Sequence, residues 1–212
     1  MGMAEIEDSL KSTLRELVQK IHFDQISTAA LCSSAHVSRA AFYSRYNSKE
    51  ALLADILYDD ICKPVLSIRN VIPTVKYGNT AHSLIDDVQC DTILANREFY
   101  TAIMRDCPTL FITLLTQGLT AVNETVLVPY DLPDLEKEYM AFFYAANHAM
   151  LYRKWIGDGF IVEPSKLINW YFKWAAESWM KVSRELGIGS VREILDRDRD
   201  RKEHTSELQS RE

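Results

Sequence analysis

The sequence predicts an all-α protein, and three observations support this fold class. Apolar residues recur at the three-to-four-residue spacing of amphipathic helices along most of the 212-residue chain. No segment shows the strict apolar–polar alternation that is typical of a half-buried strand. The composition, with 47% hydrophobic and 25% charged residues, is that of a globular protein. We therefore expect a small N-terminal helical unit followed by a larger helical domain.

The first predicted helix spans residues 5–21. Its apolar positions fall on one face and are Ile6, Leu10, Leu14, Leu17, Val18 and Ile21. Either Ser27 or Thr28 can cap a second, short helix that continues to Cys32, because both side chains accept hydrogen bonds from helix-initial N–H groups. This second helix consists of small residues, which predicts close packing.

The third helix is predicted to start at Ser38 and to contain the segment SRAAFYSRY. Asn47 or Ser48 can cap a fourth helix over residues 48–66, which is expected to bend or end near Pro64 because proline lacks a backbone donor. Two short helices joined by a tight turn, with Ser, Arg, Tyr and Lys on the second, are typical of a helix-turn-helix DNA-binding unit.

Residues 69–80 include Pro73, Gly78 and Asn79 and form the expected linker. We accordingly place a DNA-binding domain with its connecting helix at residues 1–66 and a second helical domain at residues 80–190. Helical periodicity in the second domain predicts five runs, which are residues 81–95, 98–105, 109–128, 136–155 and 165–186. The fourth of these runs carries two apolar faces, so more than one neighbour should cover it.

The tail, residues 196–212, begins with DRDRDR and has mixed charge and almost no apolar residues. We expect it to be disordered, and we leave a non-native origin open.

Charge and cysteine usage exclude several classes of protein. A net charge of -6 argues against a protein that coats nucleic acid non-specifically, although Arg39, Arg45 and Lys49 make the helix-turn-helix segment locally basic. The four cysteines form no CxxC pair and the five histidines no HExxH motif, so we expect no disulfide framework, metal site or cofactor. No nucleophile–base constellation supports an all-α enzyme. Neither a signal peptide nor a membrane-spanning run is evident, so we expect a cytoplasmic protein.

The segment from Ser27 to Leu53 resembles the DNA-binding signature of the TetR family of bacterial transcriptional regulators. That pattern combines a capping Ser/Thr, a small-residue helix, a turn ending in Val-Ser, an aromatic-Tyr pair and then Ser-Lys-Glu-x-Leu. The matching residues here are Ser27, Ala30 to Cys32, Val37-Ser38, Phe42-Tyr43 and Ser48 to Leu52. One position departs from the pattern, because the family commonly has Gly in the turn where this chain has His36. Gly reaches a positive φ at no steric cost, and His is among the side chains that tolerate it.

Helix-turn-helix geometry assigns roles to the residues of this segment. Arg39 can bind a guanine bidentately, Ala40 and Ala41 allow close approach or touch a thymine methyl group, and Ser44 can reach a base edge. The expected phosphate contacts are Ser27, Thr28, Ser38, Tyr43, Arg45 and Lys49. A core position for Tyr43 and a merely solvated charge for Arg45 remain alternatives.

The resemblance further implies a homodimer that responds to a small-molecule effector and binds a palindromic operator, and we expect a repressor. An effector pocket is expected among Phe99, Tyr100, Met104, Phe111, Phe143, Tyr144, Asn147 and Met150, with plain core packing as the alternative. The expected dimer contacts are Tyr139, Trp155, Trp170, Tyr171, Trp174 and Ser178. An alternative keeps the fold but makes the chain a coactivator whose helical domain binds a protein partner.

Overall fold

A computed structural model of the chain describes residues 2–68, 80–128 and 132–171, and it confirms the all-α class, since every regular element in these ranges is helical. The elements of the N-terminal half are α1 (Met3–Lys20), the 3₁₀ turn η1 (Phe23–Gln25), α2 (Thr28–Ser34), α3 (Arg39–Tyr43), α4 (Lys49–Leu57), the π-helical turn η2 (Tyr58–Cys62) and α5 (Lys63–Ile68). Those of the second half are α6 (Thr80–Ala95), α7 (Arg97–Asp106), α8 (Pro108–Leu127), α9 (Asp134–Gly157) and α10 (Pro164–Tyr171).

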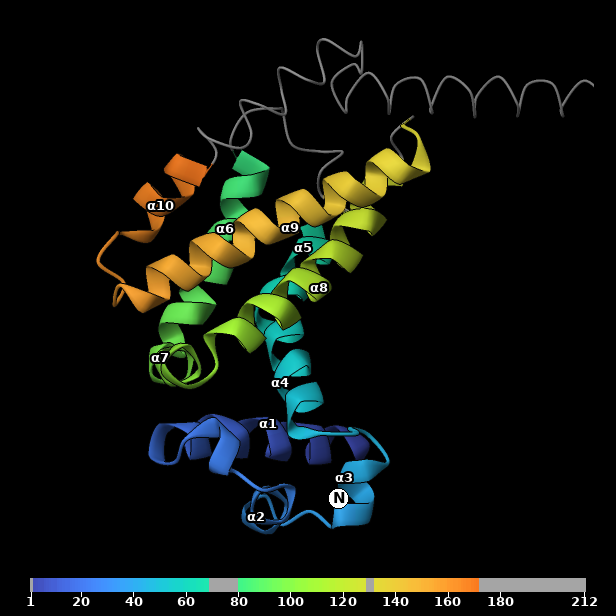
Figure 1. Ribbon diagram of the computed structural model, residues 1–212, viewed down its shortest axis with the longest axis vertical. Coiled ribbons are helices and arrows are strands. Elements are labelled where there is room, and N and C mark those ends of the chain that lie inside the picture. The colour runs from blue at the N-terminus through green and yellow to red at the C-terminus, as the bar shows by residue number, and fades with distance from the viewer. Residues whose placement is uncertain (1, 69–79, 129–131, 172–212) are drawn as a thin grey trace, which may run out of the picture.

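The elements form two bodies joined by one continuous helical rod (Figure 1). Helices α1, α2 and α3 lie together at one end of the molecule, and α4 rises from them into the bundle made by α5 to α10. The described ranges leave out the predicted linker except for Thr80, which begins α6, as well as the second half of the last predicted helix and the tail.

The N-terminal unit buries the predicted stripe of α1. Leu10, Leu14 and Val18 are fully buried and belong to the same hydrophobic cluster as Leu31 of α2 and Phe42 of α3. Each buried aliphatic side chain of this kind contributes about 1.5–3 kcal/mol relative to exposure. The unit is small, and α1 also packs against α4 and α7, so the second body supports it.

The connecting rod runs through α4, η2 and α5 without a break, so of the expected bend or end near Pro64 the end is not observed. Pro64 is the second residue of α5 and follows the π-helical turn, in which the Lys63 N–H donates to the Tyr58 carbonyl. In a regular α-helix, the proline ring would clash with the carbonyl four residues earlier. The wider turn just before Pro64 lets the helix continue past it.

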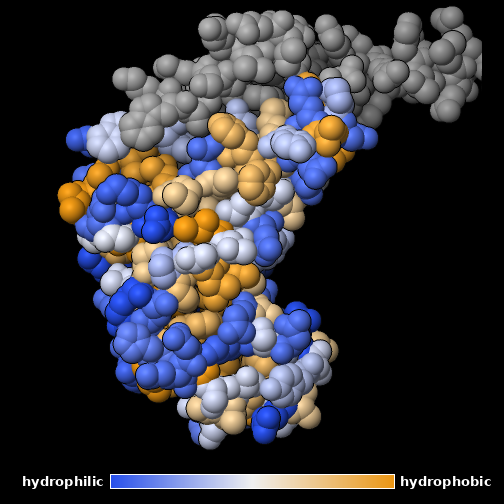
Figure 2. Space-filling model, in the orientation of Figure 1, coloured by the Kyte–Doolittle hydropathy of each residue, from blue (hydrophilic) through white to orange (hydrophobic). Residues whose placement is uncertain are grey.

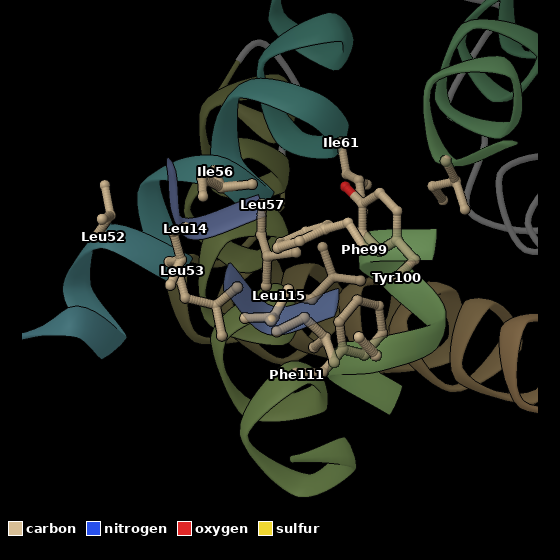
Figure 3. Packing of buried hydrophobic residues seen from close by; sticks show 14 of the residues in the cluster. Leu14, Leu52, Leu53, Ile56, Leu57, Ile61, Phe99, Tyr100, Phe111 and Leu115 are labelled. Atoms are coloured by element: carbon tan, nitrogen blue, oxygen red, sulfur yellow. The ribbon is translucent and has the colours of Figure 1, made fainter. Parts of the chain in front are cut away.

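The rod is buried along most of its length. Figure 3 shows Leu52, Leu53, Ile56, Leu57 and Ile61 of α4 and η2 packed with Phe99 and Tyr100 of α7 and Phe111 and Leu115 of α8. The core of the second body therefore extends directly along the helix that carries the DNA-binding unit.

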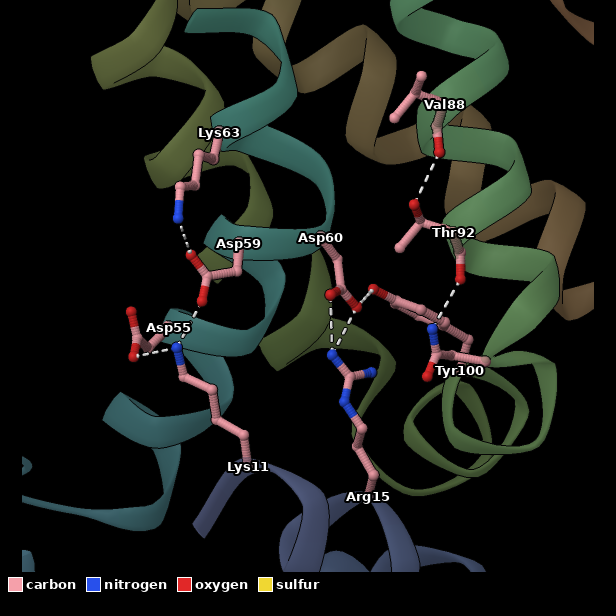
Figure 4. Close-up of polar contacts among 10 residues, drawn as sticks. Lys11, Arg15, Asp55, Asp59, Asp60, Lys63, Val88, Thr92 and Tyr100 are labelled. Carbon is pink, nitrogen blue, oxygen red and sulfur yellow. Dashed lines mark hydrogen bonds and ion pairs between the residues drawn. The ribbon is translucent and has the colours of Figure 1, made fainter. Parts of the chain in front are cut away.

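Ion pairs join α1 to the same rod (Figure 4). Lys11 contacts Asp55 at 2.7 Å and Asp59 at 2.5 Å, and these carboxylates raise the pKa of Lys11 although burial opposes its charge. Arg15 binds Asp60 at 2.8 and 2.9 Å, and Asp60 also accepts the Tyr100 hydroxyl at 2.6 Å. Polar contacts thus link α1, the rod and α7.

Helices α8 and α9 pack most extensively against each other, and α9 also contacts α7 and α6, so more than one neighbour covers it as expected. The buried stripe of α9 contains Ala141, Ala145 and Ala149 and continues to Tyr152 and Trp155. Alanines spaced four residues apart let two helix axes approach closely. The aromatic residues Tyr139, Phe142 and Phe143 of α9 are exposed on the other side of the helix.

Helix α8 is long and apolar enough to cross a membrane by length and composition alone. Its apolar residues Phe111, Leu115, Leu119 and Val122 are instead buried in the protein core. Such a helix is therefore accounted for by packing in this fold.

Candidate nucleic-acid interface

Three serine caps define the helices of the DNA-binding unit. Ser27, Ser38 and Ser48 accept the N–H groups of Ala30, Ala41 and Ala51 at 3.1–3.2 Å and begin α2, α3 and α4, respectively. Each cap satisfies one of the N–H groups that a helix N-terminus leaves unpaired. Of the alternatives left open by the sequence, the structure selects Ser27 over Thr28 and Ser48 over Asn47.

The turn between α2 and α3 adopts the conformation expected for a glycine. His36 has a φ of 55°, in the left-handed region. The His36 N–H donates to the Ser33 carbonyl at 3.2 Å and the Val37 N–H to the Cys32 carbonyl at 2.9 Å, which is a Schellman motif. Ser9 of α1 adds a hydrogen bond from its hydroxyl to the Ala35 carbonyl at 2.8 Å. These contacts fix the direction in which α3 leaves the turn.

Helix α3 presents one solvent-facing side next to this turn. Phe42 is fully buried and anchors the helix, whereas Arg39, Ala40, Tyr43 and Ser44 are exposed. These four positions are spaced one and four residues apart, so they share one side of the helix. Tyr43 is 50% exposed with its ring edge against Phe42, so it lies outside the core. Ala41 is half-buried and faces the core more than solvent.

Arg45 is held by an acidic residue that lies far from it in sequence. Its guanidinium contacts the Glu7 carboxylate of α1 at 2.6 Å, and Glu7 raises the pKa of Arg45. The local excess of positive charge that the sequence suggests is reduced by this partner. Since Arg45 remains about half exposed, its side chain still borders the surface that α3 presents.

The Lys49 side chain, an expected phosphate contact, binds backbone carbonyls of the segment before α2. Its ammonium donates to the carbonyls of Phe23, Asp24 and Ile26 at 2.6, 3.0 and 3.0 Å. An ammonium group has three N–H donors, so all of them are used within the protein. In this arrangement the Lys49 ammonium has no N–H left for a phosphate, whereas Arg39 is the basic residue of α3 without an ion pair among the described residues.

The residues predicted to form an effector pocket are divided between the core and the surface. Phe99, Tyr100 and Phe111 are fully buried and pack against the rod, with Met104 half-buried behind them. Phe143, Asn147 and Met150 are exposed on α9, and Tyr144 is half-buried. The structure thus does not bring Phe143, Asn147 and Met150 together with the buried residues of α7 and α8.

An open groove of about 320 Å³ lies elsewhere, between α1 and α7. Its lining residues, none of which the sequence suggested, are Gln19, Arg97, Glu98, Thr101, Ala102 and Arg105.

The residues predicted for the dimer interface also divide. Tyr139 is 70% exposed, whereas Trp155 is buried and its indole N–H donates to the Val162 carbonyl at 2.7 Å, so Trp155 is corrected to a core residue. Trp170 and Tyr171 are half-buried, beneath Lys166 and against His148, respectively. Trp174 and Ser178 lie outside the described residues.

Sequence reasoning missed much of the exposed apolar face of α9. This face, which we call the α9 stripe, contains Leu135, Tyr139, Phe142, Phe143 and Met150. Figure 2 shows hydrophobic side chains on the surface over this helix. Their spacing of four, three, one and seven residues is helical and could have revealed the stripe. Which of the two apolar faces is buried depends on packing against α8, which the spacing does not specify.

Metal and disulfide chemistry find no support among the residues that the structure describes. No group of three or more His, Cys, Asp or Glu side chains could hold a metal ion there. Cys32, Cys62 and Cys90 are buried free thiols and Cys107 is a half-buried one. Burial raises the pKa of Cys62 to about 12, so this thiol stays protonated and unreactive at neutral pH.

Several solved structures share the fold. The activator of a dihydroxyacetone kinase operon, DhaS, has a TM-score of 0.54 and 18% identity, with 82% of this chain and 95% of that chain covered. The fatty acid degradation regulator FadR from Bacillus halodurans has a TM-score of 0.52 and 12% identity, covering 77% and 90%. A TetR-family regulator from Syntrophomonas wolfei has a TM-score of 0.52 and 15% identity, covering 88% and 96%.

Sequence comparison identifies the N-terminal unit. No curated protein gives a significant match. Residues 12–56 match the family model of bacterial regulatory proteins of the tetR family, and they contain the second half of α1, all of α2 and α3 and nearly all of α4. Residues 12–56 therefore form a DNA-binding domain of the tetR family of bacterial regulatory proteins, and the chain as a whole shares the fold of the solved regulators named above.

Proposed function

We propose that the chain is a cytoplasmic repressor that binds a palindromic operator as a homodimer, with the unit of residues 1–66 on DNA and the domain of residues 80–190 controlling it. The exposed side of α3 supports this proposal most directly. Arg39, Ala40, Tyr43 and Ser44 share that side, and the N-terminal residue Arg39 is placed where helix-turn-helix proteins contact base edges.

Most of the side chains that we propose as phosphate contacts are uncharged. The caps Ser27 and Ser38, with Thr28 and Tyr43 beside them, can donate hydroxyl groups to the DNA backbone. Arg45 contributes a partly neutralised charge because Glu7 holds it. We therefore expect the affinity to depend less on salt than the count of basic residues in the segment implies.

Two arguments support a dimer, which are the spacing of recognition helices on DNA and the exposed α9 stripe. One recognition helix reads a few base pairs, so two helices on successive major grooves, about 34–36 Å apart, are needed for a specific site. The α9 stripe offers a continuous apolar face of a kind that monomers rarely leave in water. A two-fold contact between two such faces would bury both stripes and place the DNA-binding units at the same side of the dimer.

Regulation would act through the rod. The buried contacts of α7 and α8 with α4 and η2 mean that a change in the packing of the second body moves the DNA-binding unit. A small-molecule effector that prefers one packing would shift the equilibrium between the two arrangements. One structural neighbour is named a regulator of fatty acid degradation, which makes apolar acids a reasonable first set of effectors to assay.

A coactivator that binds a protein partner is the second candidate. The observation that favours it is the position of Phe143 and Met150, which lie on the exposed α9 stripe instead of inside a pocket. One structural neighbour is itself named an operon activator. In this alternative the α9 stripe, or part of it, contacts another protein.

Selection of DNA from a random pool tests the primary proposal. The purified protein is expected to enrich an inverted repeat whose half-sites are one helical turn apart, and the complex should contain two chains by light scattering. Enrichment of a single half-site by one chain would contradict the homodimer. A failure to enrich any sequence, with the protein folded, would contradict operator binding and favour the coactivator.

A further inference from the structure

The short turn η1 connects α1 to α2 and is held from two sides by charged groups. Ile26, the residue after η1, is directly followed by Ser27, which caps α2. The position of η1 therefore sets the position of the α2 N-terminus. Phe23 is buried, so the turn is anchored in the core as well as by its polar contacts.

The first charged group is the Lys49 ammonium, at the start of α4. It donates to three converging carbonyls, those of Phe23, Asp24 and Ile26, and lies 4.7 Å from the centre of the Phe23 ring. Carbonyls and an aromatic face together supply a complete coordination shell for one ammonium ion. The contact fixes η1 to the beginning of the rod.

The second charged group is the Asp106 carboxylate, at the end of α7. It accepts the Phe23 N–H at 2.9 Å and contacts His22 Nδ1 at 2.7 Å, and its side chain is fully covered. Arg105 also donates to it from 2.6 Å, and Arg105, the Phe23 N–H and His22 together lower the pKa of Asp106 to about 2 although burial opposes this shift. The carboxylate is therefore charged at any physiological pH.

We infer that Lys49 and Asp106 are positioning residues for operator binding, which clamp η1 between the rod and α7 and thereby set the angle of α2 and α3. The inference rests on the DNA-binding function of the N-terminal unit. The second body would then act on the DNA-binding unit through two connections. The rod is joined to α3 at the start of α4, and α7 holds the segment before α2 through Asp106. A movement of α7 relative to the rod would therefore displace η1, because η1 is bound to both elements.

Salt dependence separates positioning by Lys49 from a phosphate contact. Replacing a phosphate-binding lysine lowers the slope of log K against log salt by about 0.9 per subunit. For Lys49→Met we expect the slope to stay unchanged while operator affinity falls about tenfold. A reduced slope would overturn the inference.

The substitution Lys49→Arg adds a second discriminator. A guanidinium group suits phosphate at least as well as an ammonium does, but its planar fork cannot direct donors at three carbonyls around one point. We expect Lys49→Arg to lose affinity nearly as much as Lys49→Met. Wild-type affinity in Lys49→Arg would assign Lys49 to the DNA backbone instead.

Asp106→Asn tests the other side of the clamp. The amide keeps the size of the side chain and one acceptor for the Phe23 N–H, but it loses the charge and turns an N–H donor toward Arg105 or His22, so its hold on η1 should weaken. Because Asp106 lies on α7, away from α3, a loss of operator affinity reports coupling and not a lost DNA contact. Asp158→Asn, which breaks the exposed Lys154–Asp158 pair at the end of α9, is the matched control and should bind normally.

Hydrogen exchange on the free protein tests the clamp without DNA. The Phe23 amide should exchange about tenfold faster in Asp106→Asn, and also faster in Lys49→Met, which does not touch that N–H group. Unchanged exchange in Lys49→Met would show that the two contacts are independent and would overturn the clamp. If the wild-type protein binds no operator while exchange behaves as expected, the proposed function fails and the clamp stands as a structural device only.

Discussion

Two basic side chains that look equivalent in the sequence, Arg39 and Lys49, have different surroundings in the structure. Arg39 is exposed on α3, whereas the Lys49 ammonium is enclosed by carbonyls. Arg45 lies between these extremes because Glu7 pairs with it. At the scale of single residues, Arg39 is therefore the basic side chain that we propose for sequence-specific reading.

Substituting Arg39 should relax the operator preference at one position of each half-site. Loss of a bidentate contact to guanine costs about 1–3 kcal/mol of discrimination against the wrong base. The measurement is a binding titration against operators that carry each of the four bases at every position. Arg39→Lys, which keeps the charge but loses the fork, should retain affinity for random DNA while losing the same preference. Unaltered base preference in Arg39→Ala would assign reading to other residues.

His36 carries the second prediction at residue scale. Its positive φ strains any side chain with a Cβ, and Gly removes that strain at the cost of a more flexible unfolded chain. We expect His36→Gly to raise the free energy of unfolding by about 0.5 kcal/mol in urea titrations, since His already tolerates this region better than most residues. His36→Val should lower it by about 1–3 kcal/mol, because β-branched residues avoid this region. Equal stability of the two variants would mean that the turn readjusts its backbone.

At the scale of elements, helix starts were predictable and buried faces were not. Ser27, Ser38 and Ser48 cap their helices through contacts that span three residues, so local sequence contains the whole signal. The buried face of α9 depends on how closely α8 approaches, and nothing local distinguishes its alanine stripe from its aromatic one. The candidate site behaves in the same way. The exposed side of α3 could be predicted from the local sequence, whereas the partners of Arg45 and Lys49 come from distant segments.

The crossing of η2 and α8 provides a prediction about elements. A Cβ on Gly118 of α8 would lie 2.8 Å from the Cys62 sulfur, so the Cys62 side chain occupies the space that a larger residue at position 118 would need. Gly118→Ala should destabilise the protein by about 1–3 kcal/mol through overpacking, as measured by urea unfolding. Adding Cys62→Ala should recover part of this loss.

A matched glycine supplies the control for this crossing. Gly157, at the end of α9, would place a Cβ in ordinary contact, 3.9 Å from the Met104 side chain. Gly157→Ala should be neutral or slightly stabilising, because alanine costs less conformational entropy in a helix. If Gly118→Ala were equally harmless, the two helices would be free to separate, and the crossing would not hold the rod in place.

For the whole molecule, the outward orientation of α9 connects folding with assembly. The alanines that face α8 let the second body close on itself, which leaves Tyr139, Phe142 and Phe143 of α9 exposed on the surface. An apolar stripe of this kind is costly in water and favours association. The same packing that fixes the monomer core therefore defines the surface available for a second chain.

A charge in the middle of the α9 stripe should separate the proposed dimer without unfolding the chain. Phe143 is 60% exposed, so Phe143→Glu removes little core packing, and its melting temperature measured at a concentration where both proteins are monomeric should match the wild type. In a two-fold interface each chain would bring one carboxylate into the contact, and burying unpaired charges opposes association. Sedimentation should show monomers at micromolar concentration, and binding to a palindromic operator should weaken toward that of a single half-site. Ile161→Glu, at an 81% exposed position in the turn after α9, is the control and should remain dimeric. A Phe143→Glu protein that stays dimeric would place the interface on another surface and return the stripe to the protein-partner alternative.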